Sequence, residues 1–172
     1  PLWYKNAIFY QIYPRSFYDS NGDGYGDFQG IIQKLDYVRN LGTDCIWLMP
    51  TYKSPLKDDG YDISDFYGVF EPFGTLDDLK QLFYEIHQRG MRVITDLVLN
   101  HCSDQHPWFQ SARKDPNSKY RNYFVWSDTD TKYQGTRIIF VDSQESNWTW
   151  DEEAGAYYWH RFYPSQPDLN YD

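Results

Sequence analysis

The chain has 172 residues, 41% of them hydrophobic, and a net charge of −9, which is enough chain to build a domain with its own core. The acidic balance disfavours nucleic acid as a partner, because phosphates select basic surfaces. No segment reaches the roughly 18 consecutive apolar residues that a membrane-spanning helix needs, and no secretion signal is recognisable. We therefore expect a soluble, cytoplasmic protein that does not contact a membrane.

Aromatic residues are unusually frequent, at 20% of the chain with 7 Trp and 17 Tyr. Aromatic faces pack well against the C–H face of a sugar ring, so the excess suits a carbohydrate ligand. An aromatic-rich core or a partner surface explains it equally well, and composition alone does not distinguish them. The two cysteines, Cys45 and Cys102, have neither metal-ligand nor disulfide-framework spacing, and we expect free buried thiols.

The first hundred residues alternate between strand and helix patterns. Apolar runs predict strands over 7–13 and 45–50 and a third from Arg92 onward, and apolar residues at helical spacing predict helices over 31–41 and 79–86. Thr75 and Asp78 have the spacing of a capping box, and Gly42 and Gly90 mark helix ends. The alternation predicts parallel strands with right-handed crossovers, the third strand being buried on both faces.

The pattern changes after His101. Residues 102–172 are rich in Trp, Tyr, Asp, Ser and Asn, with β-like pieces at 136–141 and 156–160 and no helix pattern of comparable quality. We interpret this part as an excursion inserted after the third strand. The predicted organisation is a βα segment over 1–101 followed by an inserted domain over 102–172.

A loop after the first strand carries oxygen ligands at alternate positions, as calcium requires. Its beginning resembles an EF-hand loop, with Gly24 at the sixth position, but the twelfth position is Gly30 instead of a bidentate Glu, and a strand precedes it. We predict a calcium loop outside the EF-hand fold, the alternative being a Gly/Asp turn without metal. The predicted ligands are Asp19, Asn21, Asp23, the Tyr25 carbonyl and Asp27.

Polar residues follow the second and third predicted strands. In a barrel of alternating strands and helices, the carboxyl ends of the strands carry the chemistry. The candidates are Asp58, Asp59, Tyr61 and Asp62 after the second strand, and Asp96, Asn100 and His101 after the third. Taken singly, a solvated acidic loop or an ordinary polar strand end accounts for them.

Five motifs in order, at 10–17, 19–27, 60–62, 96–101 and 166–170, resemble the α-amylase superfamily of glycoside hydrolases and glucosyltransferases. The resemblance covers the whole chain. Within that family, 146–151 and 157–162 are most similar to the trehalose synthases. Residues 11–17 look more like the oligo-1,6-glucosidases and α-glucosidases, and Ser165 stands where trehalose synthases often have His.

The resemblance implies a fold class and a reaction. The fold would be the N-terminal part of an α/β (β/α)8 TIM barrel with an excursion domain inserted after strand three. The reaction would be retaining α-glucosyl transfer that interconverts maltose and trehalose, with these α-glucosides as small-molecule partners. The alternatives are hydrolysis by an α-glucosidase or oligo-1,6-glucosidase, a non-catalytic carbohydrate-binding or transporter-associated barrel relative, and a small calcium-binding module.

The resemblance also implies roles for individual residues. Asp58, Tyr61 and His101 would contact the sugar, and Asp96 would belong to the same substrate site at the barrel floor, organising the catalytic carboxylates. Asn100 and Asp168 would bind a second calcium. The nucleophile and the acid/base would lie beyond residue 172, so no catalytic residue is assigned here and we expect this stretch alone to be inactive. The oligomeric state is left open.

Overall fold

The structure is a computed structural model that describes residues 2–172. The chain forms two compact units. The first unit contains the residues up to Lys53 and Phe66–Leu97, and the second unit contains Ser54–Asp65 and Val98–Asp172. The loop over 54–65 thus belongs to the second unit, although it interrupts the first in sequence. The division at residue 101 into barrel segment and inserted domain stays a prediction.

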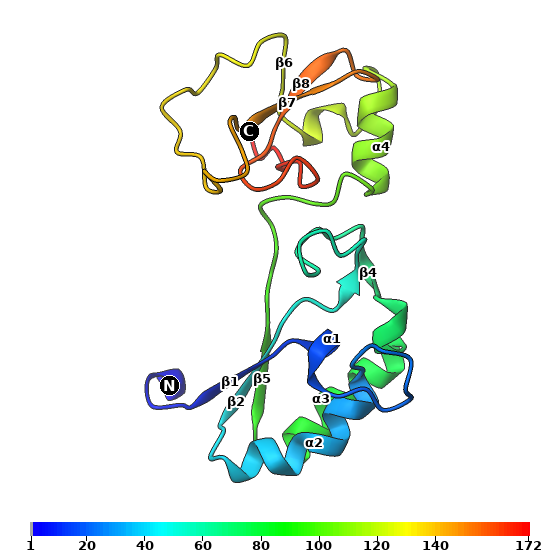
Figure 1. Ribbon diagram of the computed structural model, residues 1–172, viewed down its shortest axis with the longest axis vertical. Coiled ribbons are helices and arrows are strands. Elements are labelled where there is room, and N and C mark those ends of the chain that lie inside the picture. The colour runs from blue at the N-terminus through cyan, green and yellow to red at the C-terminus, as the bar shows by residue number, and fades with distance from the viewer. Residues whose placement is uncertain (1) are drawn as a thin grey trace. The chain divides into compact units, whose positions relative to one another are not determined.

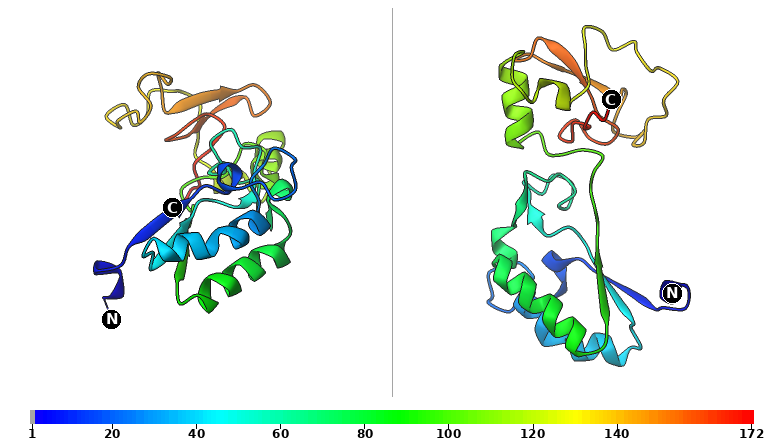
Figure 2. Two further views of the ribbon diagram at one scale, coloured as in Figure 1. Left: turned by 60° about the horizontal axis from the view of Figure 1, so that its bottom comes forward. Right: turned by 180° about the vertical axis from the view of Figure 1, so that it is seen from behind.

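The first unit is built on a parallel sheet with strand order β1-β2-β5 (Figure 1). In its register Tyr10 of β1 lies beside Ile46 of β2, which lies beside Val93 of β5. The helices α2 and α3 connect consecutive strands and lie side by side (Figure 2). The predicted strand–helix alternation and the parallel pairing are therefore confirmed, with the bounds β1 Phe9–Ile12, α2 Phe28–Asn40, β2 Cys45–Leu48, α3 Leu76–Gln88 and β5 Arg92–Thr95.

The core of the first unit lies between this sheet and the two helices. Successive strand side chains point to opposite faces, and the residues of one face pack against the helices. This packing removes the apolar stripes of α2 and α3 from water, which is the main stabilising term for an amphipathic helix. The core residues are Ile12, Phe28, Ile31, Leu35, Val38, Ile46, Leu48, Phe73, Leu82, Ile86 and Met91.

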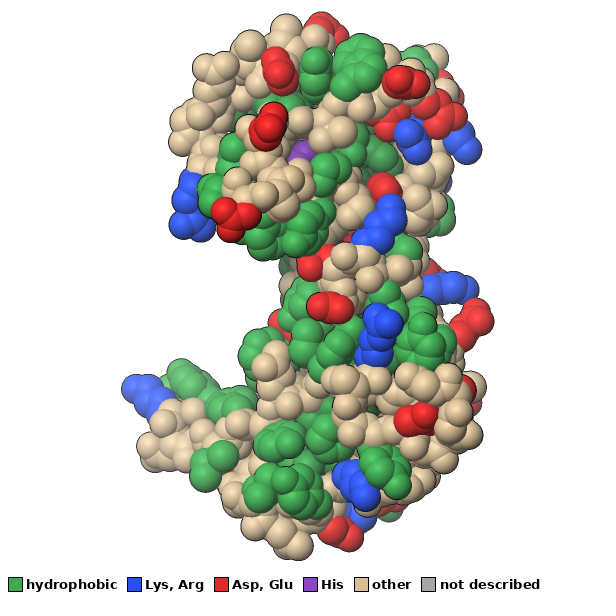
Figure 3. Space-filling model, in the orientation of Figure 1, with side chains coloured by type: hydrophobic (Ala, Val, Ile, Leu, Met, Phe, Trp, Pro, Cys, Tyr) green, Lys and Arg blue, Asp and Glu red, His purple; other side chains and the backbone are tan. Residues whose placement is uncertain are grey.

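The opposite face of the sheet is covered only in part, and β5 is largely exposed, which contradicts the prediction that the third strand is buried on both faces. Ile94 in β5 is 40% exposed, and Leu97 just beyond the strand is 75% exposed. Both helices pack on the other face, so no helix covers the Ile94 side chain. Hydrophobic side chains accordingly lie on the surface of the first unit around β1 and β5 (Figure 3).

The helix ends agree with the sequence signals. In α3 the Thr75 hydroxyl accepts from the Asp78 amide at 3.1 Å, and the Asp78 carboxylate accepts from the Thr75 amide at 2.8 Å, completing the capping box. The helix α2 is capped by Asp27, whose carboxylate accepts from the Gly30 amide. Gly42 has φ 89° just past α2, a conformation that glycine adopts without steric cost.

The second unit holds an antiparallel sheet with strand order β6-β8-β7 and the helix α4. The Phe109 ring of α4 packs at 5.0–5.7 Å, measured between ring centroids, from the rings of Phe124, Trp126 and Tyr158. The strand expected at 156–160 is confirmed. The bounds are α4 Pro107–Lys114, β6 Trp126–Ser127, β7 Trp148–Asp151 and β8 Ala156–Trp159.

Two predictions for this unit are wrong. Residues 136–141 form no strand, because they pair with no neighbouring strand and instead follow a turn in which the Thr136 amide donates to the Tyr133 carbonyl. The helix α4 was not expected, since eight residues are too few for a clear helical period. Pro107 at its first position and the His106 ring nitrogen, which accepts from the Trp108 amide at 3.1 Å, start it.

The remaining elements are short. The strands β3 and β4 form a separate two-stranded sheet. Within residues 2–172, no helix is long and apolar enough to cross a membrane. The bounds are η1 Trp3–Lys5, α1 Pro14–Phe17, β3 Tyr52–Lys53, β4 Asp65–Val69, η2 Glu71–Phe73 and η3 Arg121–Tyr123.

Removing the Thr75 hydroxyl tests whether the capping box stabilises α3. We expect Thr75→Ala to lower the free energy of unfolding by about 1 kcal/mol, because the Asp78 amide loses its acceptor. Thr75→Ser keeps the hydroxyl and is the matched control. Urea unfolding measures both variants, and an equal loss in the two would contradict a role for the cap.

Candidate functional site

The loop over 54–62 is wrapped around one buried carboxylate. Asp62 is fully buried, and its Oδ1 accepts from the Ser54 hydroxyl at 3.0 Å and from the Asp58 amide at 3.1 Å. Its Oδ2 accepts from the Lys57 amide at 2.9 Å. Three hydrogen bonds to a charged acceptor offset the cost of burying it. Asp62 therefore fixes the backbone on which Asp58 stands.

His101 lies against this loop with both ring nitrogens engaged. Its Nε2 is 3.1 Å from the Tyr61 carbonyl oxygen, and its Nδ1 is 3.2 Å from the Asn100 amide nitrogen. A carbonyl only accepts, which assigns the proton to Nε2 and lets Nδ1 accept from Asn100. Burial lowers the pKa of His101, and the Tyr61 contact and the charges of Asp58 and Asp62 oppose it only in part. The ring is thus neutral at neutral pH.

Gln166 lies beside Asp58 and His101 and donates to Asp58 but not to His101, because His101 Nε2 already carries a proton. Its side chain is fully buried, and its Nε2 donates to Asp58 Oδ2 at 2.8 Å and lies 3.2 Å from His101 Nε2. Its Oε1 accepts from the Tyr163 amide at 3.2 Å. Gln166 is not among the predicted site residues, because a lone Gln in a turn-like stretch carries no local signal of burial. We call Asp58, His101 and Gln166, with the Tyr61 carbonyl, the Asp58 cluster.

An aromatic ring closes one side of the cluster. The centroid of the Phe162 ring lies 5.1 Å from that of His101, and the Phe140 ring lies 6.0 Å from Phe162. The Asp58 carboxylate keeps lone pairs for hydroxyls, the neutral imidazole and the buried amide help to hold it in place, and the aromatic face offers a surface for an apolar ring face. This chemistry suits a neutral polyol better than an anion.

Asn100 and Asp168 are brought together, as the resemblance implied. The Asn100 amide donates to Asp168 Oδ1 at 3.0 Å, and the Arg161 amide donates to the same oxygen at 3.2 Å. Burial raises the pKa of Asp168 to about 6, although these two donors and the Arg161 charge act in the opposite direction. The pair offers oxygen donors, and a second calcium there stays a prediction.

Asp96 belongs to the first unit, and its carboxylate accepts from the Trp47 indole at 2.9 Å. The hydrogen bond joins neighbouring strands β2 and β5 near their carboxyl ends. Its membership of the substrate site stays a prediction.

The predicted calcium loop is ordered by its own carboxylates. Asp19 accepts from the Gly24 amide at 2.9 Å and from the Gly22 amide at 2.7 Å, and these bonds lower the pKa of Asp19. Asp27 is buried and accepts from Ser20 and Gly30, so it also closes the loop onto α2. Across residues 2–172, no three side chains of His, Cys, Asp or Glu gather as a metal site would need.

The structure also explains why the twelfth loop position is glycine. A Cβ at Gly30 would collide with the Tyr18 carbonyl oxygen, so a side chain there would have to displace the backbone. A bidentate Glu is therefore sterically excluded at this position. The loop departs from the EF-hand pattern because it packs against the preceding segment.

Asp62 offers a test of how the Asp58 cluster is held. We expect Asp62→Ala to lower the free energy of unfolding by about 2–3 kcal/mol, because three donors lose a buried charged acceptor. Asp59→Asn, at the exposed end of the same loop, is the control, because Asn adopts the φ of 50° found there. Chemical denaturation of both variants measures the difference, and a neutral Asp62→Ala would refute the assignment.

Comparison with known proteins places the chain in a family. Residues 11–172 match the model of the alpha-amylase catalytic domain. The trehalose synthase/amylase TreS of Mycolicibacterium smegmatis is 57% identical over 170 residues, which are 99% of this chain and 29% of that protein. The oligo-1,6-glucosidase of Parageobacillus thermoglucosidasius is 50% identical over 171 residues, again 99% of this chain, and 30% of that protein.

A solved structure agrees with these relatives. The trehalulose synthase MutB from Pseudomonas mesoacidophila MX-45 superposes with a TM-score of 0.90 at 47% identity, over 100% of this chain and 31% of that one. A variant of MutB has been solved in complex with its substrate sucrose. The chain thus spans less than a third of the length of these proteins, and its parallel strands and helices are the N-terminal part of a (β/α)8 barrel. This chain belongs to the α-amylase family.

Proposed function

We propose that the full-length protein is a retaining α-glucosyl-transferring enzyme of the trehalose synthase kind, which interconverts maltose and trehalose. The observation that carries the proposal is the 57% identity to TreS across 99% of the chain. The sucrose complex of a MutB variant adds a second relative that acts on a disaccharide. In this proposal the present residues hold the sugar, and the reacting carboxylates belong to the part beyond residue 172.

The contacts of the Asp58 cluster support a sugar-holding role. Asp58 is an acceptor whose one oxygen is fixed by Gln166 at 2.8 Å, leaving its remaining lone pairs for sugar hydroxyls. Neutral His101 adds no charge, so it suits an uncharged ligand. The Phe162 ring beside it provides a face for the C–H side of a pyranose. A sugar-binding site needs contacting side chains whose orientation is fixed by buried neighbours.

The proposed reaction proceeds by two displacements. One carboxylate attacks the anomeric carbon while a second donates a proton to the leaving oxygen, the two lying roughly 5 Å apart in retaining enzymes. The released glucose stays enclosed, turns, and attacks the glucosyl-enzyme through its anomeric hydroxyl. The task of Asp58, His101 and Gln166 is to keep the transferred glucosyl ring fixed through both steps.

A hydrolytic function is the second candidate, favoured by the 50% identity to an oligo-1,6-glucosidase. The two reactions share the first displacement and differ in the acceptor, which is water in the hydrolase. They therefore differ in how well the site retains glucose and excludes water.

Product analysis with maltose tests the function. We expect the full-length protein to form mostly trehalose with little free glucose, as separated by chromatography. Asp58→Asn should lower kcat/KM by roughly 100-fold, because a charged acceptor for sugar hydroxyls is lost. Asp59→Asn is the matched control, since Asn adopts the φ of 50° found there. Mostly glucose would move the assignment to the α-glucosidases.

We further propose calcium as a structural ion of the loop over 19–27. The donor set is made of carboxylate, amide and carbonyl oxygens, which a hard cation prefers. The low pKa of Asp19 keeps one of these donors ionised. A second calcium at Asn100 and Asp168 belongs to the same proposal. The ligands would be Asp19, Asn21, Asp23, the Tyr25 carbonyl and Asp27 for the first ion.

Chelation tests the calcium proposal. We expect EDTA to lower the unfolding temperature of the full-length protein and calcium to restore it, since an ion at 100 times its Kd stabilises by about 2.7 kcal/mol. Asp23→Asn should weaken the response, whereas Asp77→Asn, in the exposed first turn of α3, should leave it unchanged. An unfolding temperature that changes with neither EDTA nor calcium would contradict the proposal of a structural calcium ion.

A further inference from the structure

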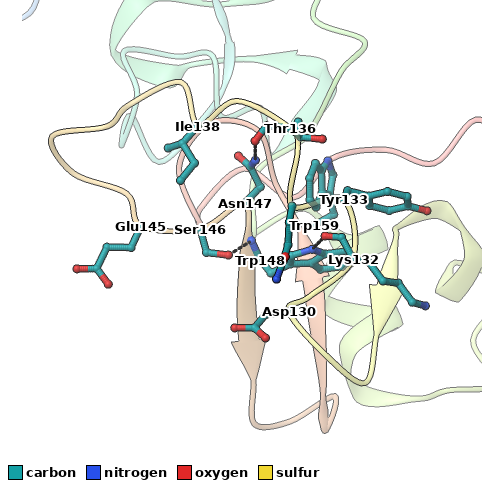
Figure 4. A pocket seen from close by; sticks show the side chains of 11 residues that line it. Asp130, Lys132, Tyr133, Thr136, Ile138, Glu145, Ser146, Asn147, Trp148 and Trp159 are labelled. Atoms are coloured by element: carbon teal, nitrogen blue, oxygen red, sulfur yellow. Dashed lines mark hydrogen bonds between the residues drawn. The ribbon is translucent and has the colours of Figure 1, made fainter.

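The second unit contains a cavity that the proposed function does not use. It has a volume of about 260 Å³ and lies between the loop over 130–147 and the strands β7 and β8 (Figure 4). None of its lining residues belongs to the Asp58 cluster. The volume is just below the usual range for ligand pockets and suits one ring-sized molecule.

One wall of this cavity is aromatic. The Trp148 and Trp159 rings meet at 4.9 Å and 70°, and Tyr133 stacks on Trp148 at 6.2 Å and 12° and meets the edge of Trp159 at 5.5 Å. Trp148 is 5% exposed, and its indole donates to the Lys132 carbonyl at 2.9 Å, so this wall is fixed. Tyr133 is 61% exposed, which leaves ring surface for a ligand.

The backbone holds Tyr133 in an uncommon conformation. Its φ is 58°, and only Leu56 and Asp59 share a positive φ among the non-glycine residues of 2–172. A bulky residue in this region persists where its surroundings determine it, and such positions are common at ligand sites. Both other residues stand in the loop of the Asp58 cluster, so all three lie beside a candidate binding site.

Polar groups complete the cavity. Asn147 is 6% exposed, and its amide nitrogen donates to the Thr136 carbonyl at 3.2 Å. Its Oδ1 is an acceptor for a ligand hydroxyl. Asp130 and Glu145 also line the space, although the Glu145 carboxylate points away from the other lining side chains (Figure 4), and Lys132 is the one basic residue in the lining. This charge balance disfavours phosphate or carboxylate ligands.

We propose that this cavity is a second carbohydrate site, which binds one neutral hexopyranose unit on the Tyr133 ring. The apolar face of the sugar would pack on the aromatic wall, and its hydroxyls would donate to Asn147 and Asp130. The identification of the bound sugar as a glucosyl residue rests on the proposed function. The aromatic and polar lining, which indicates a carbohydrate site, is observed independently of that function. The site would hold an additional glucoside on the second unit.

The experiment uses the full-length protein carrying Asp58→Asn, which weakens the Asp58 cluster. Maltose binding is measured by titration calorimetry, with glucose 6-phosphate as the anionic probe. We expect Tyr133→Gly to weaken maltose binding by roughly tenfold or more, because the stacking ring is lost. Glycine accepts the positive φ, so folding is preserved, as circular dichroism would verify. Tyr133→Phe should bind normally, as should the control Tyr67→Ala, whose side chain is 92% exposed in the first unit.

The outcomes separate this inference from the proposed function. Maltose affinity that is unchanged in Tyr133→Gly, or a preference for glucose 6-phosphate, would overturn the second site. Binding that depends on Tyr133 supports the site even if the protein with an intact Asp58 cluster releases glucose from maltose instead of forming trehalose. In that case the proposal of glucosyl transfer is wrong, and the proposal of a second carbohydrate site is supported.

Discussion

The buried carboxylate of Asp62 is the constraint on which the candidate site depends. Its burial is tolerated because Ser54, Lys57 and Asp58 all donate to it. These donors come from one short loop, so satisfying the charge determines the shape of the loop. The placement of Asp58 is then a consequence of hydrogen-bond satisfaction more than of packing.

Three segments far apart in the sequence meet around this loop. The Ser103 amide donates to the Ile63 carbonyl at 2.8 Å, and the Asp104 amide donates to the Ser165 carbonyl at 2.8 Å. The Lys57 ammonium pairs with Asp104 at 3.0 Å on the outside of the loop. Backbone pairing thus positions the segments, and the side chains of the Asp58 cluster follow from it. We therefore expect a substitution that disrupts this backbone pairing to disrupt the whole Asp58 cluster and not a single residue of it.

Local signals predicted the first unit well, and long-range contacts explain what they missed. The Thr75–Asp78 cap and the strand alternation are encoded within a few residues. The role of Gln166 depends on a partner 108 positions away, which no local pattern specifies. The exposed face of β5 was missed because an apolar run indicates a preference for burial and does not say what covers it. The strand-end argument predicted that Asp58, Tyr61 and His101 lie on one face, the motif resemblance implied that they contact a sugar, and the structure adds the hydrogen bonds between them.

Asp27 links the predicted calcium loop to the fold in a further way. The same carboxylate accepts from the Ser20 amide inside the loop and from the Gly30 amide at the start of α2. Any event that draws this carboxylate toward the loop also changes how the helix begins. The stability of the first turn of α2 therefore depends on the state of the loop. Amide hydrogen exchange at that turn would change when the loop binds an ion, although the other predicted ligands lie outside the helix.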